Sequence, residues 1–185
     1  QSVNLNLCAS LQRPWIARYK AFRKYKTFCY PVLPDGCLFR DAVEHDDIYS
    51  DMAIASDGKY LCEVEWDFAT GLGTIIYGPC FSREEHHLLY RFDGERASAL
   101  GIRLSTKKED AAPLRIVVNG TDSYSLPIKT SEEFIYYTLP IAPTEVKTVA
   151  LYPTGTDAMI DAIVLGDRAA EVTFAEENNS VEPTL

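Results

Sequence analysis

The 185-residue sequence lacks several features that would assign it to a common functional class. It has no run of roughly 18 apolar residues, the length that a membrane-spanning helix needs, so we expect no membrane span. It has no CxxC pair and only three histidines, so a zinc site is not expected. Nucleophile signatures of the Ser and Cys type are absent, and no helical pattern follows Gly71 and Gly73 to make them a phosphate loop.

Positive charge is also scarce, because 18 Lys and Arg stand against 27 Asp and Glu and give a net charge of -9. Nucleic-acid binding needs a clustered excess of cations, so we expect no nucleic-acid partner. The exception is residues 13–26, which hold six Lys and Arg and no acid. This basic segment is predicted to dock a protein partner or a polyanion, or else to be a solvated helix face that pairs with the protein's own acids.

The cysteines gather in the first part of the chain. They are Cys8, Cys29, Cys37, Cys62 and Cys80. Five thiols allow at most two disulfides plus one free thiol, and their clustering predicts that disulfides join the N-terminal segment to the body; the pairing stays open. The start at Gln1 resembles a mature chain after signal-peptide removal, and sequons begin at Asn119 and Asn178. We therefore expect a secreted or extracellular-surface protein.

Strand patterns fill the chain from residue 37 onward, without helical patterns between them. The apolar, β-branched runs 114–118 and 159–165 match buried strands of a sandwich core. Asn119-Gly120 is the strongest hairpin turn signal, and a second turn is expected at Asp93-Gly94. Further strands are expected at 60–68, 74–77, 87–92, 99–104, 134–139 and 146–152. So many regularly spaced strands predict an all-β, antiparallel, two-sheet jelly-roll β-sandwich.

The first 36 residues have a different pattern. Trp15, Tyr19 and Phe22 recur at helix-like spacing, and Pro14 suits a first helical turn. We therefore predict a helical, cysteine-containing N-terminal extension over residues 1–36. The β-sandwich domain is expected over 37–175 and an acidic flexible tail over 176–185.

Several short motifs in the strand region have a familiar order. They are Tyr-Leu-Cys-Glu-Val-Glu-Trp from residue 60, Leu-Arg-Ile-Val-Val-Asn-Gly-Thr from 114, Phe-Ile-Tyr-Tyr from 134, Val-Lys-Thr-Val-Ala-Leu-Tyr from 146 and Met-Ile-Asp-Ala-Ile-Val-Leu from 159. Together they resemble the galactose-binding-like β-sandwich of carbohydrate-binding modules over residues 59–166. The resemblance implies a jelly roll, with ligands bound in the loops at one end or on the concave sheet face. It also implies a structural calcium, whose ligands here would be Asp41, Glu44 and the last-strand Asp161.

Asp161 is a lone carboxylate inside an otherwise apolar run. A buried carboxylate must be met by an ion, a cation or backbone donors. Calcium, which takes six to eight oxygen ligands, is one such partner. The alternative is that Asp161 lies on the solvent face of an edge strand, because alternation places it opposite Ile160.

Sugar recognition uses flat aromatic faces with a few hydrogen-bonding groups beside them. The chain has 11 Tyr and two Trp, of which Trp66 is assigned to the core. The candidate ligand-binding residues are Tyr49, Tyr77, Arg91, Asn119, Asp122, Tyr124, Tyr136 and Tyr152. Aromatic residues are also normal packing residues of strands, so each candidate has a structural alternative.

These patterns together predict a non-catalytic, lectin-like module that binds a glycan or glycoprotein. A structural or adhesive extracellular protein, which binds a protein partner or self-assembles, is the alternative. A jelly-roll lyase or hydrolase is less favoured, because the acids of residues 63–67 lie along one strand face instead of facing each other across a cleft. The acid–imidazole cluster at residues 84–87 is interpreted as a turn before a strand, since adjacent strand residues face opposite ways.

Overall fold

The computed structural model describes residues 27–42, 46–49, 64–66, 74–77 and 83–178. Apart from one short 3-10 helix, the regular elements of these ranges are all β-strands, and none of them is a helix that could cross a membrane. The elements are β1 Thr27–Val32, β2 Leu38–Asp41, β3 Asp47–Tyr49, β4 Val64–Trp66, β5 Thr74–Tyr77, β6 His87–Thr106, β7 Leu114–Val118, β8 Asp122–Leu126, β9 Ser131–Tyr152, β10 Met159–Leu165, η2 Ala169–Glu171 and β11 Thr173–Asn178. The helix predicted over the N-terminal extension lies outside the described residues.

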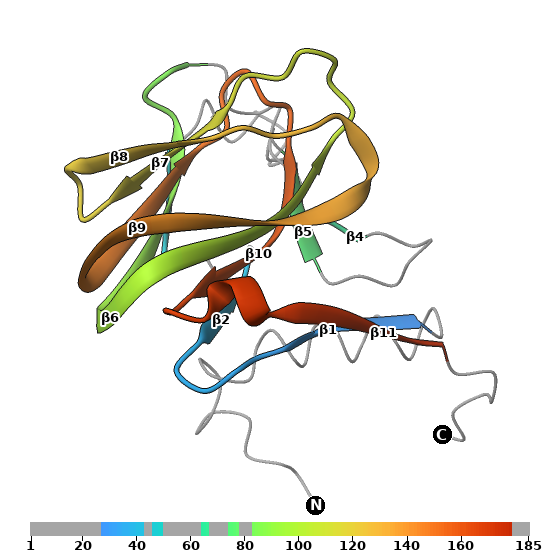
Figure 1. Ribbon diagram of the computed structural model, residues 1–185. Helices are drawn as coiled ribbons and strands as arrows, with labels where there is room; N and C mark the ends of the chain where they lie inside the picture. The colour runs from blue at the N-terminus through green and yellow to red at the C-terminus, as the bar shows by residue number, and fades with distance from the viewer. Residues whose placement is uncertain (1–26, 43–45, 50–63, 67–73, 78–82, 179–185) are drawn as a thin grey trace, which may run out of the picture.

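Two long antiparallel strands, β6 and β9, organise the fold (Figure 1). They pair with each other along most of their length and bend together. One half of each strand therefore lies in the first layer, and the other half lies in the second layer. The first layer has the order β4-β5-β10-β6-β9, with β2 also paired to β10. The second layer has the order β3-β6-β9-β7-β8. This arrangement confirms the predicted antiparallel jelly-roll sandwich.

The bends correct one prediction from the sequence. Asp93-Gly94 does not reverse the chain, because β6 continues through it as one strand. Gly94 has φ 83° and lies where the β6–β9 register shifts between Arg91 and Glu95. A second shift falls near Pro140, which has no N–H to donate to a ladder. Such irregularities bend a strand, so turn residues here carry each strand from one layer to the other.

The hairpin predicted at Asn119-Gly120 is confirmed. It joins β7 to β8, and both residues have positive φ, 53° and 74°. Two successive residues with positive φ are what a tight two-residue hairpin turn requires. The turn fixes the β7–β8 register in which Ile116 lies opposite Tyr124.

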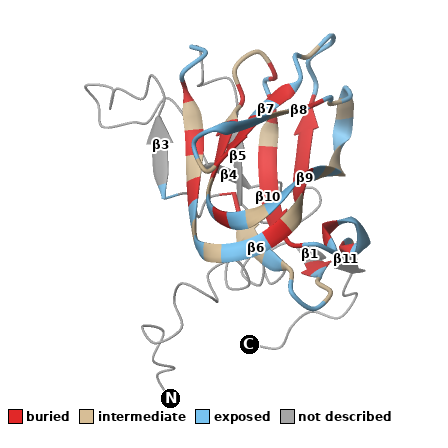
Figure 2. Ribbon diagram, turned by 60° about the vertical axis from the view of Figure 1, so that its left-hand side comes forward, coloured by how far each residue is buried: buried red, intermediate tan, exposed pale blue. Residues whose placement is uncertain are grey.

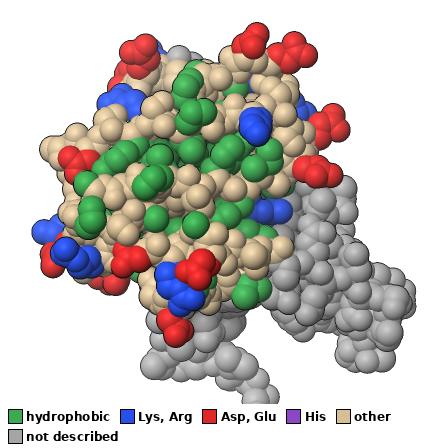
Figure 3. Space-filling model, in the orientation of Figure 1, with side chains coloured by type: hydrophobic (Ala, Val, Ile, Leu, Met, Phe, Trp, Pro, Cys, Tyr) green, Lys and Arg blue, Asp and Glu red, His purple; other side chains and the backbone are tan. Residues whose placement is uncertain are grey.

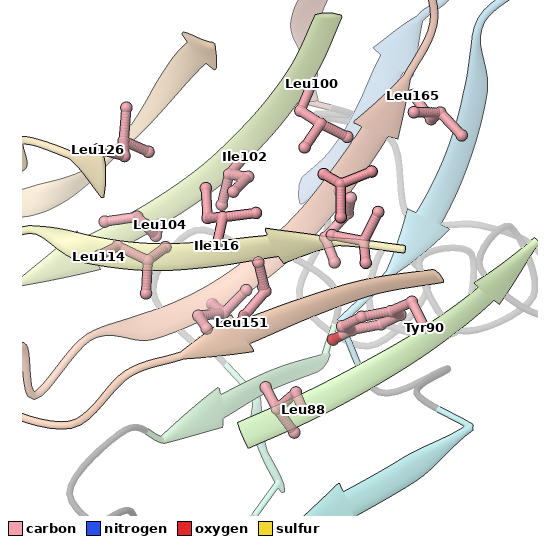
Figure 4. Close-up of a cluster of buried hydrophobic side chains, with 14 of the residues drawn as sticks. Leu88, Tyr90, Leu100, Ile102, Leu104, Leu114, Ile116, Leu126, Leu151 and Leu165 are labelled. Carbon is pink, nitrogen blue, oxygen red and sulfur yellow. The ribbon is translucent and has the colours of Figure 1, made fainter. Parts of the chain in front are cut away.

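The main core lies between the two layers and confirms the two β-branched runs as core strands. Runs of buried residues lie at the end of β6, on β7 and β10, and near the end of β9 (Figure 2). On β6, alternate residues face inward, and Leu100, Ile102 and Leu104 are at most 1% exposed. They meet Ile116 and Leu151 of the second layer (Figure 4).

One open side of the sandwich carries half-buried hydrophobic residues packed against this core. They are Tyr124, Ile128, Tyr137 and Leu139. The two tyrosines of this set tie β8 and its following loop to β9. Ala142 N donates to Tyr124 Oη at 2.9 Å, and Lys129 N donates to Tyr137 Oη at 3.0 Å. Hydrophobic side chains also form a band across the face seen in Figure 3.

A second, smaller hydrophobic cluster covers the outer face of the first layer. Its buried members are Val164, Ala169 and Val172, with Tyr136 and Phe174 packed against them. It is completed by η2 and by the two-stranded ribbon that β1 forms with β11 (Figure 1). β1 belongs to the predicted N-terminal extension, and β11 spans the predicted start of the tail. The two predicted boundaries, after residues 36 and 175, stay predictions.

Candidate functional site

The outer face of the second layer carries a row of aromatic and basic residues that crosses four strands. Arg115 of β7 lies opposite Tyr152 of β9. His87 of β6 follows on the other side of Tyr152, one position before Leu88, which pairs with Leu151. Tyr49 of β3 pairs with His87, although its side chain lies outside the described part. We call Arg115, Tyr152 and His87 the aromatic row.

The side chains of the aromatic row contact one another. The guanidinium carbon of Arg115 lies 4.5 Å from the centre of the Tyr152 ring, a cation–π geometry. The His87 ring centre is 4.7 Å from that of Tyr152, with the two planes inclined by 31°. His87 Nδ1 in turn lies 2.8 Å from the carbonyl oxygen of Glu85. Tyr152 and His87 are half-buried and Arg115 is exposed, so the row is accessible and its rings are held in place.

The next row along the strands is made of small apolar residues. Val117 pairs with Ala150, which pairs in turn with Leu89. Val117 and Ala150 are each only 6% exposed. One further row along, Arg91 lies opposite Thr148. Between the aromatic row and the polar row, the face therefore carries small, largely buried apolar side chains, which we call the apolar strip.

Arg91 is one of the predicted ligand-binding residues, and its backbone is firmly placed. Its N–H donates to Asp46 Oδ2 at 2.5 Å, and its carbonyl accepts from Arg40 Nη2 at 2.6 Å. Arg40 Nη1 also lies 3.4 Å from Asp46 Oδ2. The exposed Arg91 side chain thus starts from a backbone that is fixed on both sides.

Asn119, Asp122 and Tyr124 lie elsewhere, at the β7–β8 hairpin. The amide of Asn119 is used within the fold, since its Oδ1 accepts from Lys147 N at 2.7 Å and its Nδ2 donates to Glu145 O at 2.9 Å. Asp122 is exposed at the start of β8. Tyr124 is on the core side of the edge strand, and its hydroxyl accepts the hydrogen bond from the following β9 backbone described above. Asn119 and Tyr124 therefore have structural contacts that account for them.

Tyr136 is separated from both groups, on the outer face of the first layer. Its hydroxyl donates to Ala169 O at 2.6 Å, and its ring lies 5.3 Å from that of Phe174. Burial raises the pKa of this hydroxyl well above its ordinary value. Tyr77 lies on β5 with its side chain outside the described part. The eight predicted residues thus fall in several places, and only Arg91, Tyr152 and the strand position of Tyr49 share the face of the aromatic row.

Asp161 is fully buried and has a cationic partner. Its Oδ2 lies 2.8 Å from Arg103 Nη1, and the two side chains are 0% and 9% exposed. β10 is an internal strand, and its register against β6 shifts at Asp161. The alternative of a solvent-facing Asp161 on an edge strand is therefore wrong. A cation as its partner, one of the options for a buried carboxylate, is confirmed.

Arg103 is itself enclosed by aromatic rings. Its guanidinium carbon lies 5.0 Å from the ring centres of both Phe134 and Phe174. Phe134 comes from β9 and Phe174 from β11. Through these contacts the Arg103–Asp161 pair connects β6, β10 and β9 of the first layer to β11 of the ribbon. The arrangement satisfies a buried charge and leaves no exposed group for a ligand.

The predicted calcium ligands can be placed only in part. Asp41 is fully buried on β2 and pairs with Ala162, next to Asp161. Glu44 lies outside the described residues. The described residues contain no group of three or more side chains placed to hold a metal, and the carboxylate of Asp161 is already met by Arg103. Calcium coordination therefore stays a prediction, and its test has to include Glu44.

Two other features singled out from the sequence can be placed in the structure. The segment 83–85 is a turn before β6, as interpreted from the sequence, and the 6% exposed His86 accepts a hydrogen bond from Arg83 N through Nδ1 at 3.1 Å. Cys37 is a free, half-buried thiol whose pKa is raised by burial. The side chains of the other four cysteines lie outside the described part, so the predicted disulfides stay predictions.

Sequence reasoning did not select Arg115 or assign a role to His87. Arg115 is the one charged residue in the run 114–118, which is a signal that it faces outward from a buried strand. That signal does not reveal which residue lies beside it. The neighbours are set by the β7–β9 and β9–β6 registers, which join distant parts of the chain.

No family model matches the sequence, and no curated protein matches it either. Solved structures are similar in fold. CsCBM6-3 from Clostridium stercorarium, solved in complex with cellobiose, has a TM-score of 0.52 at 15% identity, over 71% of this chain and 95% of that chain. A family 6 carbohydrate-binding module from Clostridium cellulolyticum in complex with xylose has a TM-score of 0.51 at 9% identity, over 71% and 98%.

An enzyme is among the similar structures as well. The exo-beta-1,3-galactanase of Phanerochaete chrysosporium, solved with galactose, has a TM-score of 0.51 at 10% identity. The match covers 70% of this chain but only 29% of the enzyme. At these identities the similarity establishes the fold, which is the galactose-binding-like β-sandwich that the sequence motifs resembled.

Proposed function

We propose that the protein is a non-catalytic, lectin-like carbohydrate-binding protein, and that its binding surface is the aromatic row together with the adjoining apolar strip. The observation that carries this proposal is the arrangement of Tyr152, held between Arg115 and His87 on an accessible sheet face. Sugars present both C–H faces and hydroxyl groups, so they are bound by flat rings with hydrogen-bonding groups beside them.

The fold supports the same proposal. Modules with this sandwich have been solved with cellobiose and with xylose. A shared fold does not fix a function, so the argument depends on the face and its residues. We include secretion in the proposal, because a glycan or glycoprotein partner of this kind is met chiefly outside the cell.

The proposal is tested by binding of the full chain to a panel of soluble glycans and polysaccharides, measured by array and then by calorimetry. We expect Tyr152→Ala to weaken binding of the best glycan by about tenfold, a loss of roughly 1.4 kcal/mol. Tyr152→Phe is the matched control, since it keeps the ring, and it should bind within about twofold of the wild type.

Two results would contradict the proposal. A wild-type chain that binds no glycan on the panel would remove the function itself. A folded Tyr152→Ala chain that binds as well as the wild type would move the site away from the aromatic row. Thermal unfolding of both variants shows whether each chain is folded under the binding conditions.

A further inference from the structure

We propose that the aromatic row recognises an acidic glycan, with Arg115 receiving a carboxylate or sulfate group of the sugar. This inference rests on the proposed function and specifies the ligand class of the same face. It follows from two observations, which are that Arg115 is exposed without an ion-pair partner among the described residues and that nearby acids are paired with other cations.

The guanidinium of Arg115 is positioned by stacking and not by an ion pair. It lies over the Tyr152 ring at 4.5 Å, and the residue is exposed. Among the described residues no carboxylate oxygen lies within 4.0 Å of it, whereas Arg103 and Arg168 have such partners at 2.8 and 2.6 Å. Stacking uses the flat face of a guanidinium and leaves its N–H donors at the edge available. Those donors match the two oxygens of a carboxylate or sulfate.

Two acids of the neighbouring segments are paired with other cations. The carboxylate of Asp46 lies 3.4 Å from Arg40, and that of Glu85 lies 4.0 Å from Arg83. Neither is paired with Arg115. The face also holds a second cation, Arg91 of β6, whose side chain is exposed. The exposed Ser125 of β8 lies opposite Arg115. The hydroxyl of Ser125 and the guanidinium of Arg115 are thus neighbouring donors for an anionic group, whereas Arg91 lies four positions further along β6 than His87.

The net charge of the whole chain opposes binding of an anion. At a net charge of -9 the protein as a whole repels a polyanion, so attraction has to be local to be observed. An exposed, oriented guanidinium provides that local attraction. Uronic acids and sulfated sugars offer the same anionic chemistry, and the choice between carboxylate and sulfate is left to separate arms of the experiment.

The experiment measures binding of the full chain to three matched ligands by calorimetry. These are an oligogalacturonate, a sulfated galactan oligosaccharide and an uncharged galactan oligosaccharide. We expect at least one acidic ligand to bind more tightly than the neutral one, and Arg115→Gln to weaken that binding by about tenfold. Arg115→Lys, which keeps the charge but loses the fork, should give an intermediate loss.

Arg96→Gln is the matched control. Arg96 is an exposed arginine at the bend of β6, away from the aromatic row and opposite Glu145, and its substitution changes the net charge by the same amount. We expect it to bind every ligand as the wild type does. Arg115→Gln should weaken binding of the acidic ligand more than binding of the neutral ligand, because only the acidic ligand loses a charge-assisted contact.

The other outcomes separate a failure of the acidic-glycan inference from a failure of the proposed function. Binding of the neutral ligand alone overturns the acidic-glycan inference and leaves the proposed function intact. Binding of none of the three ligands, nor of any glycan on the wider panel, overturns the proposed function. Acidic binding that Arg115→Gln leaves unchanged, or that Arg96→Gln weakens equally, overturns the inference, because the anion is then bound elsewhere or by general charge.

Discussion

At the scale of single residues, the buried hydroxyl of Tyr90 makes the free energy of unfolding depend on pH. Tyr90 is fully buried between the layers, and its hydroxyl donates to Ala42 O at 2.7 Å. Burial, with a further contribution from Asp41, raises its pKa well above the ordinary value of 10.0. The folded protein therefore holds this proton at a pH where the unfolded chain releases it.

We expect Tyr90→Phe to lower the free energy of unfolding by about 1 kcal/mol at neutral pH, because the buried hydrogen bond to Ala42 is lost. The raised pKa means that the Tyr90 contribution is fully present below about pH 10 and declines as the pH rises above it. Urea unfolding between about pH 7 and 11 should therefore show a shallower alkaline decline for the variant. An equal decline in both chains would contradict this explanation.

At the scale of elements, the pair between Arg103 and Asp161 links β6 to β10 and, through Phe134 and Phe174, to β9 and β11. A buried ion pair adds little net stability over well-packed apolar groups, but removing one partner leaves an uncompensated charge. The pair thus favours one register of β10, in which the irregularity at Asp161 faces Arg103.

We expect Asp161→Asn to lower the free energy of unfolding by about 3–5 kcal/mol, because Arg103 stays buried without its counter-charge. The double variant Arg103→Leu with Asp161→Leu should recover much of that loss. Urea unfolding measures both. Asp157→Asn is the control, since its 3.9 Å ion pair with Lys108 is exposed and its removal should cost no more than about 0.5 kcal/mol. A single variant as stable as this control would show that the pair is not required.

At the scale of the whole molecule, the β1–β11 ribbon joins the sandwich through the second hydrophobic cluster. Phe174 of the ribbon contacts the sandwich, with its ring centre 5.3 Å from that of Tyr136 and 5.0 Å from the guanidinium carbon of Arg103. The aromatic row lies on the opposite layer. A ligand on that row and the ribbon therefore use different outer faces of the same sandwich.

We expect the ribbon and the sandwich to unfold together, and Phe174→Ala to lower the free energy of unfolding by about 2 kcal/mol, since loss of the half-buried ring leaves a gap beside Arg103. Thr173→Ala, at an exposed neighbouring position on β11, is the control and should have little effect. Circular dichroism and intrinsic fluorescence should give one coincident transition in urea. Two separate transitions would show that the ribbon unfolds independently.

The sequence by itself determined the features that depend on neighbouring residues. Alternation and β-branched runs identified the core strands at 114–118 and 159–165, and Asn119-Gly120 identified the hairpin, because both signals are local. The same local rules failed at Asp93-Gly94, where a turn signal became a bend. Pairing between β6 and β9 overrides the local preference there, since the ladder continues on either side of the irregularity.

Only the tertiary structure decided which side chains meet. Asp161 was recognisable as exceptional, but its partner Arg103 is 58 positions away and is brought to it by the β6–β10 register. Tyr152 was a candidate among several tyrosines, and it became the centre of a site because β7 and β6 place Arg115 and His87 beside it. Strand registers join distant parts of the chain and depend on the packing of the whole core, which no local pattern records.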